Sequence, residues 1–228
     1  MAPDSRTIFA QRARSPFGTL SSDMRIVGPQ SLADFAPALR PIGAAMVFNG
    51  FDPGVDRNLR EALLTSGALQ APAARAARPI EAPGLSAGEA VGMSLIHGDL
   101  EMGATGTVTY VNNGKVYAFG HPFLNLGPTA FPMTRARILT VLPSLDSSMK
   151  IATMGPIIGT MTQDRATAVG GTLGAGPGEV QVSVALTSDR APTRRFSFSV
   201  LRDPTLTPLF TYVAMLSALR TFGRFTVT

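Results

Sequence analysis

The side chains best suited to acid–base chemistry in this chain are its two histidines, His97 and His121. An imidazole has its ordinary pKa near neutrality, so it can take and return a proton when it is held in place. His121 stands between Gly120 and a proline that ends the preceding strand, because proline cannot donate a hydrogen bond to a sheet. His97 lies close to Asp99, and we predict a structural, hydrogen-bonded role for it at a strand end. Zinc usually needs three or four ligands at readable spacing and the chain has no cysteine, so we expect neither a metal nor a cofactor.

The segment before His121 has the pattern of a β-hairpin. Residues 106–111 and 115–119 are rich in β-branched and aromatic side chains, which suit a pleated sheet. Asn113-Gly114 between them tolerates the positive φ angles of a two-residue type I′ turn. The predicted cross-strand pairs are Tyr110 with Tyr117, Val108 with Phe119, and Gly106 with His121. Since side chains alternate along a strand, His121 should share one face of the hairpin with the aromatic residues and Val108.

This hairpin resembles one in a known family. It is similar to the histidine-bearing hairpin of the SpoIVB sporulation peptidases, which are serine peptidases of a chymotrypsin-like type. The similarity lies in Gly106-Thr107-Val108-Thr109, followed after a short hairpin by Ala118-Phe119-Gly120-His121. The similarity extends through residues 118–128, 131–145 and 159–171 to large bacterial proteins with this peptidase domain, and it covers residues 88–228. The resemblance implies that His121 is a catalytic general base and that the substrate is a protein or peptide. It also implies a place in the cell envelope or outside the cell.

A hydroxyl nucleophile is the part of this chemistry that the sequence does not supply. The family's nucleophile lies in a segment of the type Gly-Met-Ser-Gly-Ser-Pro, and no such segment occurs in the chain. Residues 84–88 fit the general G-x-S-x-G pattern, but that pattern places its serine between a strand and a helix. Here a proline-rich stretch precedes Ser86 and a strand is expected after it, so we interpret the match as chance.

Two aspartates are candidates for the carboxylate that orients the base in a catalytic triad. Asp164, in the sequence Gln163-Asp164-Arg165, is the stronger catalytic candidate. Its alternative roles are an ion pair with Arg165 or the cap of a turn. Asp146 is the second candidate.

The composition favours a β-dominated fold with many turns. Hydrophobic residues make up 45% of the 228 residues and charged residues 15%, which provides apolar material for a packed core. The 23 glycines and 18 prolines favour short elements joined by turns. The net charge of +5 comes from scattered arginines, whereas a nucleic-acid site would cluster them with aromatic residues, so we expect no nucleic-acid partner. We predict a mainly β fold with flanking helices (α+β), in which the resemblance implies an incomplete chymotrypsin-like β-barrel portion.

Sequence patterns divide the chain into three parts. Residues 1–69 are predicted to hold a mobile tail, helices over 31–39 and 53–67, and a strand over 44–48 between them. Residues 70–87 are an Ala/Pro/Arg-rich linker. Residues 88–228 form the barrel portion, with strands over 90–97, 137–142, 156–163 and 166–171, and a hairpin of 180–186 with 195–201. A helix follows that Asp203-Pro204 starts and Gly223 ends, and its uninterrupted apolar stretch is too short to span a membrane.

Both ends of the chain have the pattern of cuts within a longer protein. Residues 1–20 lack the apolar core of a signal peptide and a clean first element, and residues 225–228 start a strand that nothing follows. A mobile tail is the alternative explanation for the N-terminal residues. The sequence thus predicts part of a SpoIVB-like serine endopeptidase that carries the general base, lacks the nucleophile segment and is inactive alone. The alternative function is a non-catalytic cell-envelope module that binds a peptide or scaffolds the remainder of a larger parent chain.

Overall fold

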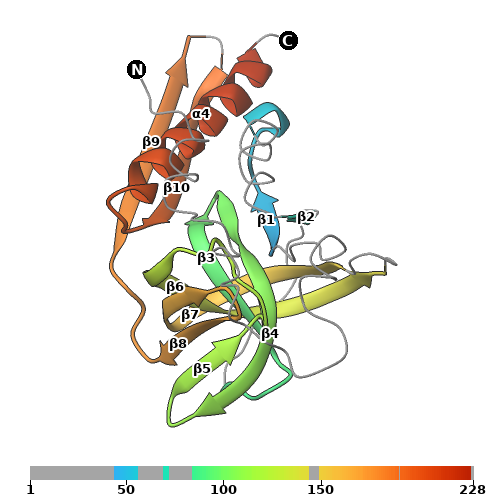
Figure 1. Ribbon diagram of the computed structural model, residues 1–228. Coiled ribbons are helices and arrows are strands. Elements are labelled where there is room, and N and C mark those ends of the chain that lie inside the picture. Colours follow the sequence, from blue (N-terminus) through green and yellow to red (C-terminus); the bar gives the residue numbers. More distant parts are fainter. Residues whose placement is uncertain (1–43, 56–68, 72–83, 144–148, 190, 227–228) are drawn as a thin grey trace, which may run out of the picture.

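The computed structural model describes residues 44–55, 69–71, 84–143, 149–189 and 191–226 (Figure 1). The predicted helix over 31–39, most of the helix over 53–67, most of the linker over 70–87, and Asp146 lie outside these residues. Residues 53–55 are described and helical, and Asp52 Oδ1 accepts a hydrogen bond of 2.8 Å from the Gly54 N–H. The predicted capped start of the second helix is therefore confirmed.

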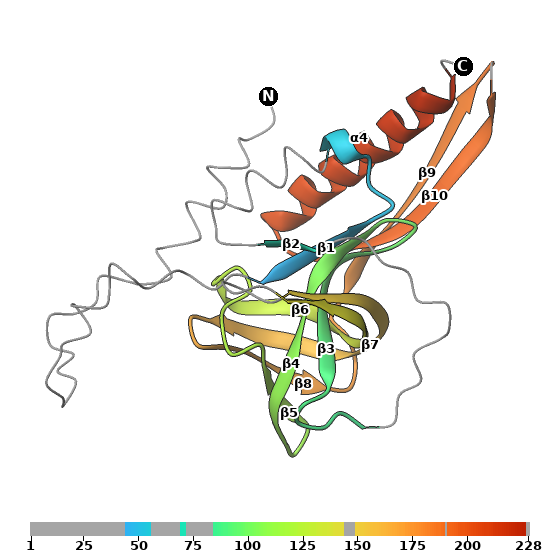
Figure 2. The same cartoon turned by 90° about the vertical axis from the view of Figure 1, so that its right-hand side faces the viewer.

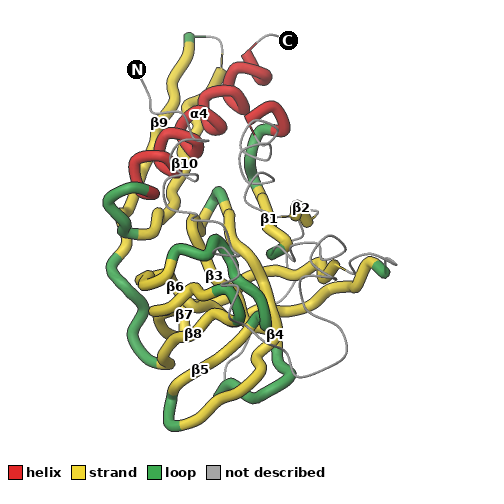
Figure 3. The backbone as a smooth tube through the Cα atoms, in the orientation of Figure 1, coloured by secondary structure: helices red, strands yellow, loops and turns green. Residues whose placement is uncertain are grey.

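The described residues form one sheet of ten strands with a helix beside it (Figure 3). The strands are β1 Ala45–Asn49, β2 Leu69–Ala71, β3 Ala90–Gly98, β4 Glu101–Asn112, β5 Lys115–Ala118, β6 Gly127–Leu142, β7 Met149–Arg165, β8 Ala168–Leu173, β9 Glu179–Ser188 and β10 Ala191–Leu201. Their order is β2-β1-β4-β5-β8-β7-β6-β3-β10-β9. Nine strands are antiparallel, and β2 adds a short parallel pairing to β1. The predicted mainly β class is confirmed.

Six strands turn back on one another in a partial ring, β3-β4-β5-β8-β7-β6 (Figure 2). β3 links the two ends of this partial ring, because it pairs with β4 on one side and with three residues of β6 on the other. Beyond the ring, β3 continues into a pairing with β10. Most of the buried apolar side chains of the ring strands belong to one hydrophobic cluster: Val91, Met93, Leu95, Ile96, Met102, Ala104, Val108, Val116, Ala118, Phe131, Met133, Met161 and Val169. Burial of this cluster is the main force that holds the ring together.

The longest strands, β6 and β7, extend well beyond the predicted ranges 137–142 and 156–163. The two pair with each other along most of their length, with four shifts of register. Pro128 and Pro132 interrupt the strand pattern of β6 in the sequence, and Pro156 does the same in β7. Bulges allow such prolines to remain in a strand because they release the local ladder.

The C-terminal part of the chain is the predicted hairpin, β9 with β10, and the helix α4 Leu206–Thr226. Asp203 Oδ1 accepts hydrogen bonds from the N–H groups of Thr205 (2.8 Å) and Leu206 (2.9 Å), so the predicted cap of this helix is confirmed. Phe210 and Ala214 are buried on the inner side of α4. Within the described residues, no helix combines the length and apolar character needed to cross a membrane.

Candidate functional site

The hairpin formed by β4 and β5 contains the predicted turn. Asn113 and Gly114 have φ angles of 47° and 75°, so both central residues are in the left-handed region that a type I′ turn requires. Tyr110 lies opposite Tyr117, as predicted, and their rings stack with centroids 6.5 Å apart. The turn and the register next to it are therefore confirmed.

The predicted register fails farther from the turn. A bulge lies between Val108 and Tyr110, so Val108 pairs with Ala118 instead of with Phe119. Phe119 has left the ladder with φ of 73°, although its N–H still donates to the Thr107 carbonyl at 2.9 Å. The extra residue of a bulge shifts every later pair by one position, which is why the prediction was wrong here.

The predicted pairing of Gly106 with His121 is also wrong, because β5 ends at Ala118 and His121 lies in the loop beyond it. Gly106 pairs only with Val91 of β3 among the described strand residues. Gly106 instead makes room for the ring of Phe119, since a Cβ atom at this position would lie 2.6 Å from Phe119 Cγ. Phe119 in turn contacts the imidazole of His121 edge to face, with ring centroids 5.7 Å apart. The glycine of the hairpin motif therefore positions the histidine through an aromatic ring.

His121 lies in the loop of residues 119–126 between β5 and β6, and its side chain is partly buried. Its Nδ1 atom is 2.8 Å from the carbonyl oxygen of Pro122. A carbonyl oxygen can only accept, so Nδ1 is the donor in this hydrogen bond. In the neutral form of the ring, this tautomer has its lone pair on Nε2. Among the described residues, no carboxylate or hydroxyl lies within hydrogen-bonding distance of the imidazole. The loop thus holds the imidazole through Nδ1 and leaves Nε2 without a partner among the described residues.

The side chain of Asp164 anchors this loop through hydrogen bonds to its backbone. It lies on β7, opposite Gly127, and its side chain is fully buried. Its carboxylate accepts hydrogen bonds from backbone N–H groups of the loop, at 2.8 Å from Phe123, 2.7 Å from Leu124 and 3.3 Å from Leu126. Burial raises the pKa of Asp164 above its ordinary value, and the loop N–H groups act in the opposite direction because they favour the carboxylate.

The structure therefore brings His121 and Asp164 to the same loop without a hydrogen bond between their side chains. Of the alternative roles predicted for Asp164, the cap of a turn matches its contacts with the loop backbone. Arg165, the partner in the other alternative, instead donates a hydrogen bond from Nε to Gln163 Oε1 at 2.8 Å. Sequence reasoning missed the parts played by Gly106 and the Pro122 carbonyl. A glycine inside a run of β-branched residues is a sign of close approach by another group, and this signal was present.

Ser86 and Ser94, the two described serines that precede His121 in the chain, are placed differently. Ser86 is exposed in a turn before β3, and its N–H donates to Glu89 Oε2 at 2.7 Å. This backbone hydrogen bond is the main reason why the pKa of Glu89 lies below its ordinary value. Ser94 is buried on β3, and its hydroxyl donates to the Ile96 carbonyl at 3.3 Å. Ser86 thus lacks the strand-to-helix setting of a nucleophile elbow, as expected.

His97 has a structural environment, but its partner is not the predicted one. Its Nδ1 lies 3.2 Å from Glu179 Oε1. Asp99 instead accepts a hydrogen bond from the Ser197 N–H at 2.7 Å and so ties β3 to β10. Burial raises the pKa of Glu179, and the charge of His97 opposes this shift. In the part of the chain that the structure describes, no group of three or more potential metal ligands occurs.

Comparisons of the chain with protein-family models, with curated proteins and with solved structures find no match. An imidazole with its Nδ1 proton engaged and its Nε2 free is the form that a general base needs. The loop that carries it is anchored at several backbone positions by one buried carboxylate.

Proposed function

We propose that this chain is the base-bearing part of a SpoIVB-like serine endopeptidase, with His121 as the general base on a chymotrypsin-like barrel portion. The observation that carries the proposal is the hydrogen bond from His121 Nδ1 to the Pro122 carbonyl, which leaves Nε2 as the proton acceptor. The nucleophile comes from the remainder of a larger parent chain. The substrate is a peptide bond of a protein or peptide.

In this mechanism the hydroxyl oxygen attacks the carbonyl carbon of the substrate while its proton moves to Nε2 of His121. The imidazolium then gives this proton to the leaving amine when the C–N bond breaks. A triad carboxylate would stabilise the imidazolium by its charge, whereas the Pro122 carbonyl offers only a dipole. Asp164 therefore acts as a positioning residue that fixes the loop, and the base is weaker than one in a complete triad.

A second function is favoured by one specific observation. Among the described residues, the imidazole of His121 has neither a carboxylate nor a hydroxyl within hydrogen-bonding distance. A module that has this barrel but no nucleophile would bind a peptide or act as a scaffold in the cell envelope. Labelling with an activity-based probe separates the two functions.

A fluorophosphonate probe, which labels only an activated serine, should leave the isolated chain unlabelled. A lone general base contributes about 10²–10⁴-fold to a rate, which is too little without a positioned nucleophile and an oxyanion hole. The longer parent protein, or this chain mixed with a separately expressed nucleophile segment, should be labelled. His121→Gln should lower that labelling rate at least about 100-fold.

His97→Gln is the matched control, because it alters the other histidine of the chain, which lies at the end of β3. We expect this variant to be labelled at the same rate as the unaltered protein. Labelling of the isolated chain at Ser86 or Ser94 would show that the nucleophile does not come from elsewhere. Labelling of the parent that survives His121→Gln would remove His121 from the mechanism, and a parent that is never labelled would favour the binding module.

A further inference from the structure

The strand β9 has a free edge. It is last in the strand order and pairs with β10 alone among the described residues. Natural sheets usually protect such an edge with lysine, proline or a bulge. The ten residues of β9 contain neither lysine nor proline, and their one charged side chain, Glu179, pairs with His97. In the part of the chain that the structure describes, no strand pairs with the outer N–H and C=O groups of β9.

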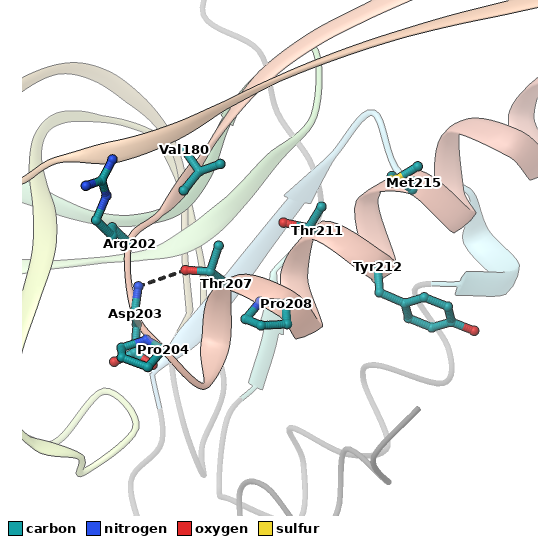
Figure 4. A pocket seen from close by; sticks show the side chains of 9 residues that line it. All are labelled: Val180, Arg202, Asp203, Pro204, Thr207, Pro208, Thr211, Tyr212 and Met215. Carbon is teal, nitrogen blue, oxygen red and sulfur yellow. Dashed lines mark hydrogen bonds between the residues drawn. The ribbon is translucent and has the colours of Figure 1, made fainter. Parts of the chain in front are cut away.

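An apolar groove runs beside this edge. One face of β9 presents Val180, Val182 and Val184, whose cross-strand neighbours on β10 are buried against α4. At the start of β9, Val180 and the first half of α4 line an open pocket of about 640 Å³ (Figure 4). This pocket, with Val182 and Val184 farther along β9, is the groove between β9 and α4. Tyr212 and Met215 line the pocket, and they remain 54% and 43% exposed. Large apolar side chains exposed in a concave surface are typical of a binding site.

The groove has a positive charge at one end. Arg202 lines the pocket and is exposed, and among the described residues no acidic side chain forms an ion pair with it. The carboxylate of Asp203, also at the pocket, is already engaged in capping α4. The helix itself contains no acidic residue. Asp203 is partly buried at the start of α4, whereas Arg202 is exposed, so the guanidinium is the charged group of this groove that a ligand can reach, and it complements a carboxylate.

The direction of β9 decides which end of a bound strand meets this charge. β9 runs from Glu179 to Ser188, so an antiparallel strand added to its edge reaches Glu179 with its carboxyl end. Arg202 lies at this same end of β9, because its Nε is 3.7 Å from the position that a Cβ atom on Gly178 would take. A parallel strand would instead bring its amino end to the guanidinium, where the like charges repel.

We propose that the groove between β9 and α4 binds the C-terminal end of an extended polypeptide. The polypeptide adds a strand to the edge of β9, places alternate apolar side chains against α4, and pairs its terminal carboxylate with Arg202. None of the residues that line this groove belongs to the His121 loop. The proposed binding site is therefore independent of the proposed peptidase function. Its ligand class is an extended apolar carboxyl terminus.

The test uses the 228-residue chain and a fluorescein-labelled peptide of about eight residues, in which threonine alternates with valine and valine is last. Fluorescence anisotropy should show saturable binding of the free acid and about tenfold weaker binding of the C-terminal amide. Arg202→Gln should weaken binding of the acid about tenfold and remove its advantage over the amide. Met215→Glu should weaken both peptides about tenfold, because it places a charge in the apolar groove.

Matched controls are Arg195→Gln and Leu219→Glu, which change an exposed arginine on β10 and an exposed leucine of α4 that does not line the pocket. Both should bind like the unaltered chain, and thermal melting should show that all four variants fold. Hydrogen exchange should slow at β9 when the acid binds. The proposal is overturned if neither peptide binds saturably, if acid and amide bind equally, or if the controls lose binding as the groove variants do. A dimer in sedimentation that Met215→Glu dissociates would also overturn it, since a second copy would then occupy the groove.

Discussion

Asp164→Asn should lower the free energy of unfolding by about 3 kcal/mol, because it leaves buried backbone N–H groups without their acceptor. The buried carboxylate accepts backbone N–H groups on both oxygens, at 2.8 Å and 2.7 Å for the two shortest. An asparagine keeps one acceptor oxygen and turns an NH₂ group toward N–H donors that have no other partner among the described residues. Urea denaturation of the two proteins measures the difference.

Asp189→Asn is the control for this substitution, because Asp189 is exposed after β9 and the chemical change is the same. It should alter the free energy of unfolding by less than about 0.5 kcal/mol. An Asp164→Asn variant as stable as this control would show that the carboxylate does not hold the His121 loop.

The stability difference between the unaltered chain and Asp164→Asn should depend on pH. The pKa of Asp164 is higher in the folded protein than its ordinary value of 3.8, so the protonated carboxyl adds to the free energy of unfolding at low pH. This added stability is lost as the pH rises from 3.8 through the raised pKa. The variant lacks this titration. The difference should therefore narrow as the pH rises through that interval, and a difference that widens would mean that the loop N–H groups outweigh burial.

Gly106→Ala should disturb both the stability and the histidine. The new Cβ would lie 2.6 Å from Phe119 Cγ, so the ring has to move, and overpacking of this kind costs about 1–3 kcal/mol. Because Phe119 contacts the imidazole edge to face, the ring-proton resonances of His121 should shift as well. Thermal melting and proton NMR of the variant measure the two effects.

Gly84→Ala is the matched control, since no described residue other than its chain neighbours has an atom within 4 Å of the position its Cβ would take. It should change stability by less than about 0.5 kcal/mol and leave the His121 resonances in place. Unchanged melting and unchanged resonances in Gly106→Ala would show that this glycine is not required by the aromatic ring.

Local chemistry explains what the sequence could predict. The type I′ turn follows from Asn113-Gly114, and the start of α4 follows from the side chain of Asp203, because both depend on residues a few positions apart. The mainly β class follows from the alternation of apolar residues. The bulge after Val108 and the left-handed φ of Phe119 could not be predicted, since tertiary packing against Gly106 selects them.

The support of the His121 loop is a long-range feature. Asp164 meets the Phe123 N–H across 41 positions of sequence, and only the pairing of β6 with β7 brings the two together. A triad pattern predicts that the carboxylate should meet the imidazole, and nothing in the residues near Asp164 shows that it meets the backbone instead. The candidate residues could thus be found from the sequence, while their contacts required the fold.

The central claim is that His121 carries its proton on Nδ1 and offers Nε2 as the base. A long-range proton–nitrogen correlation spectrum of the chain, labelled with ¹⁵N-histidine and recorded at about pH 8, reads the tautomer directly. The chain has two histidines, and His97→Gln assigns them. We expect a protonated Nδ1 and an unprotonated Nε2 for His121. A spectrum in which His121 is protonated on Nε2 would contradict the claim, because the nitrogen proposed to accept the nucleophile's proton would already carry one.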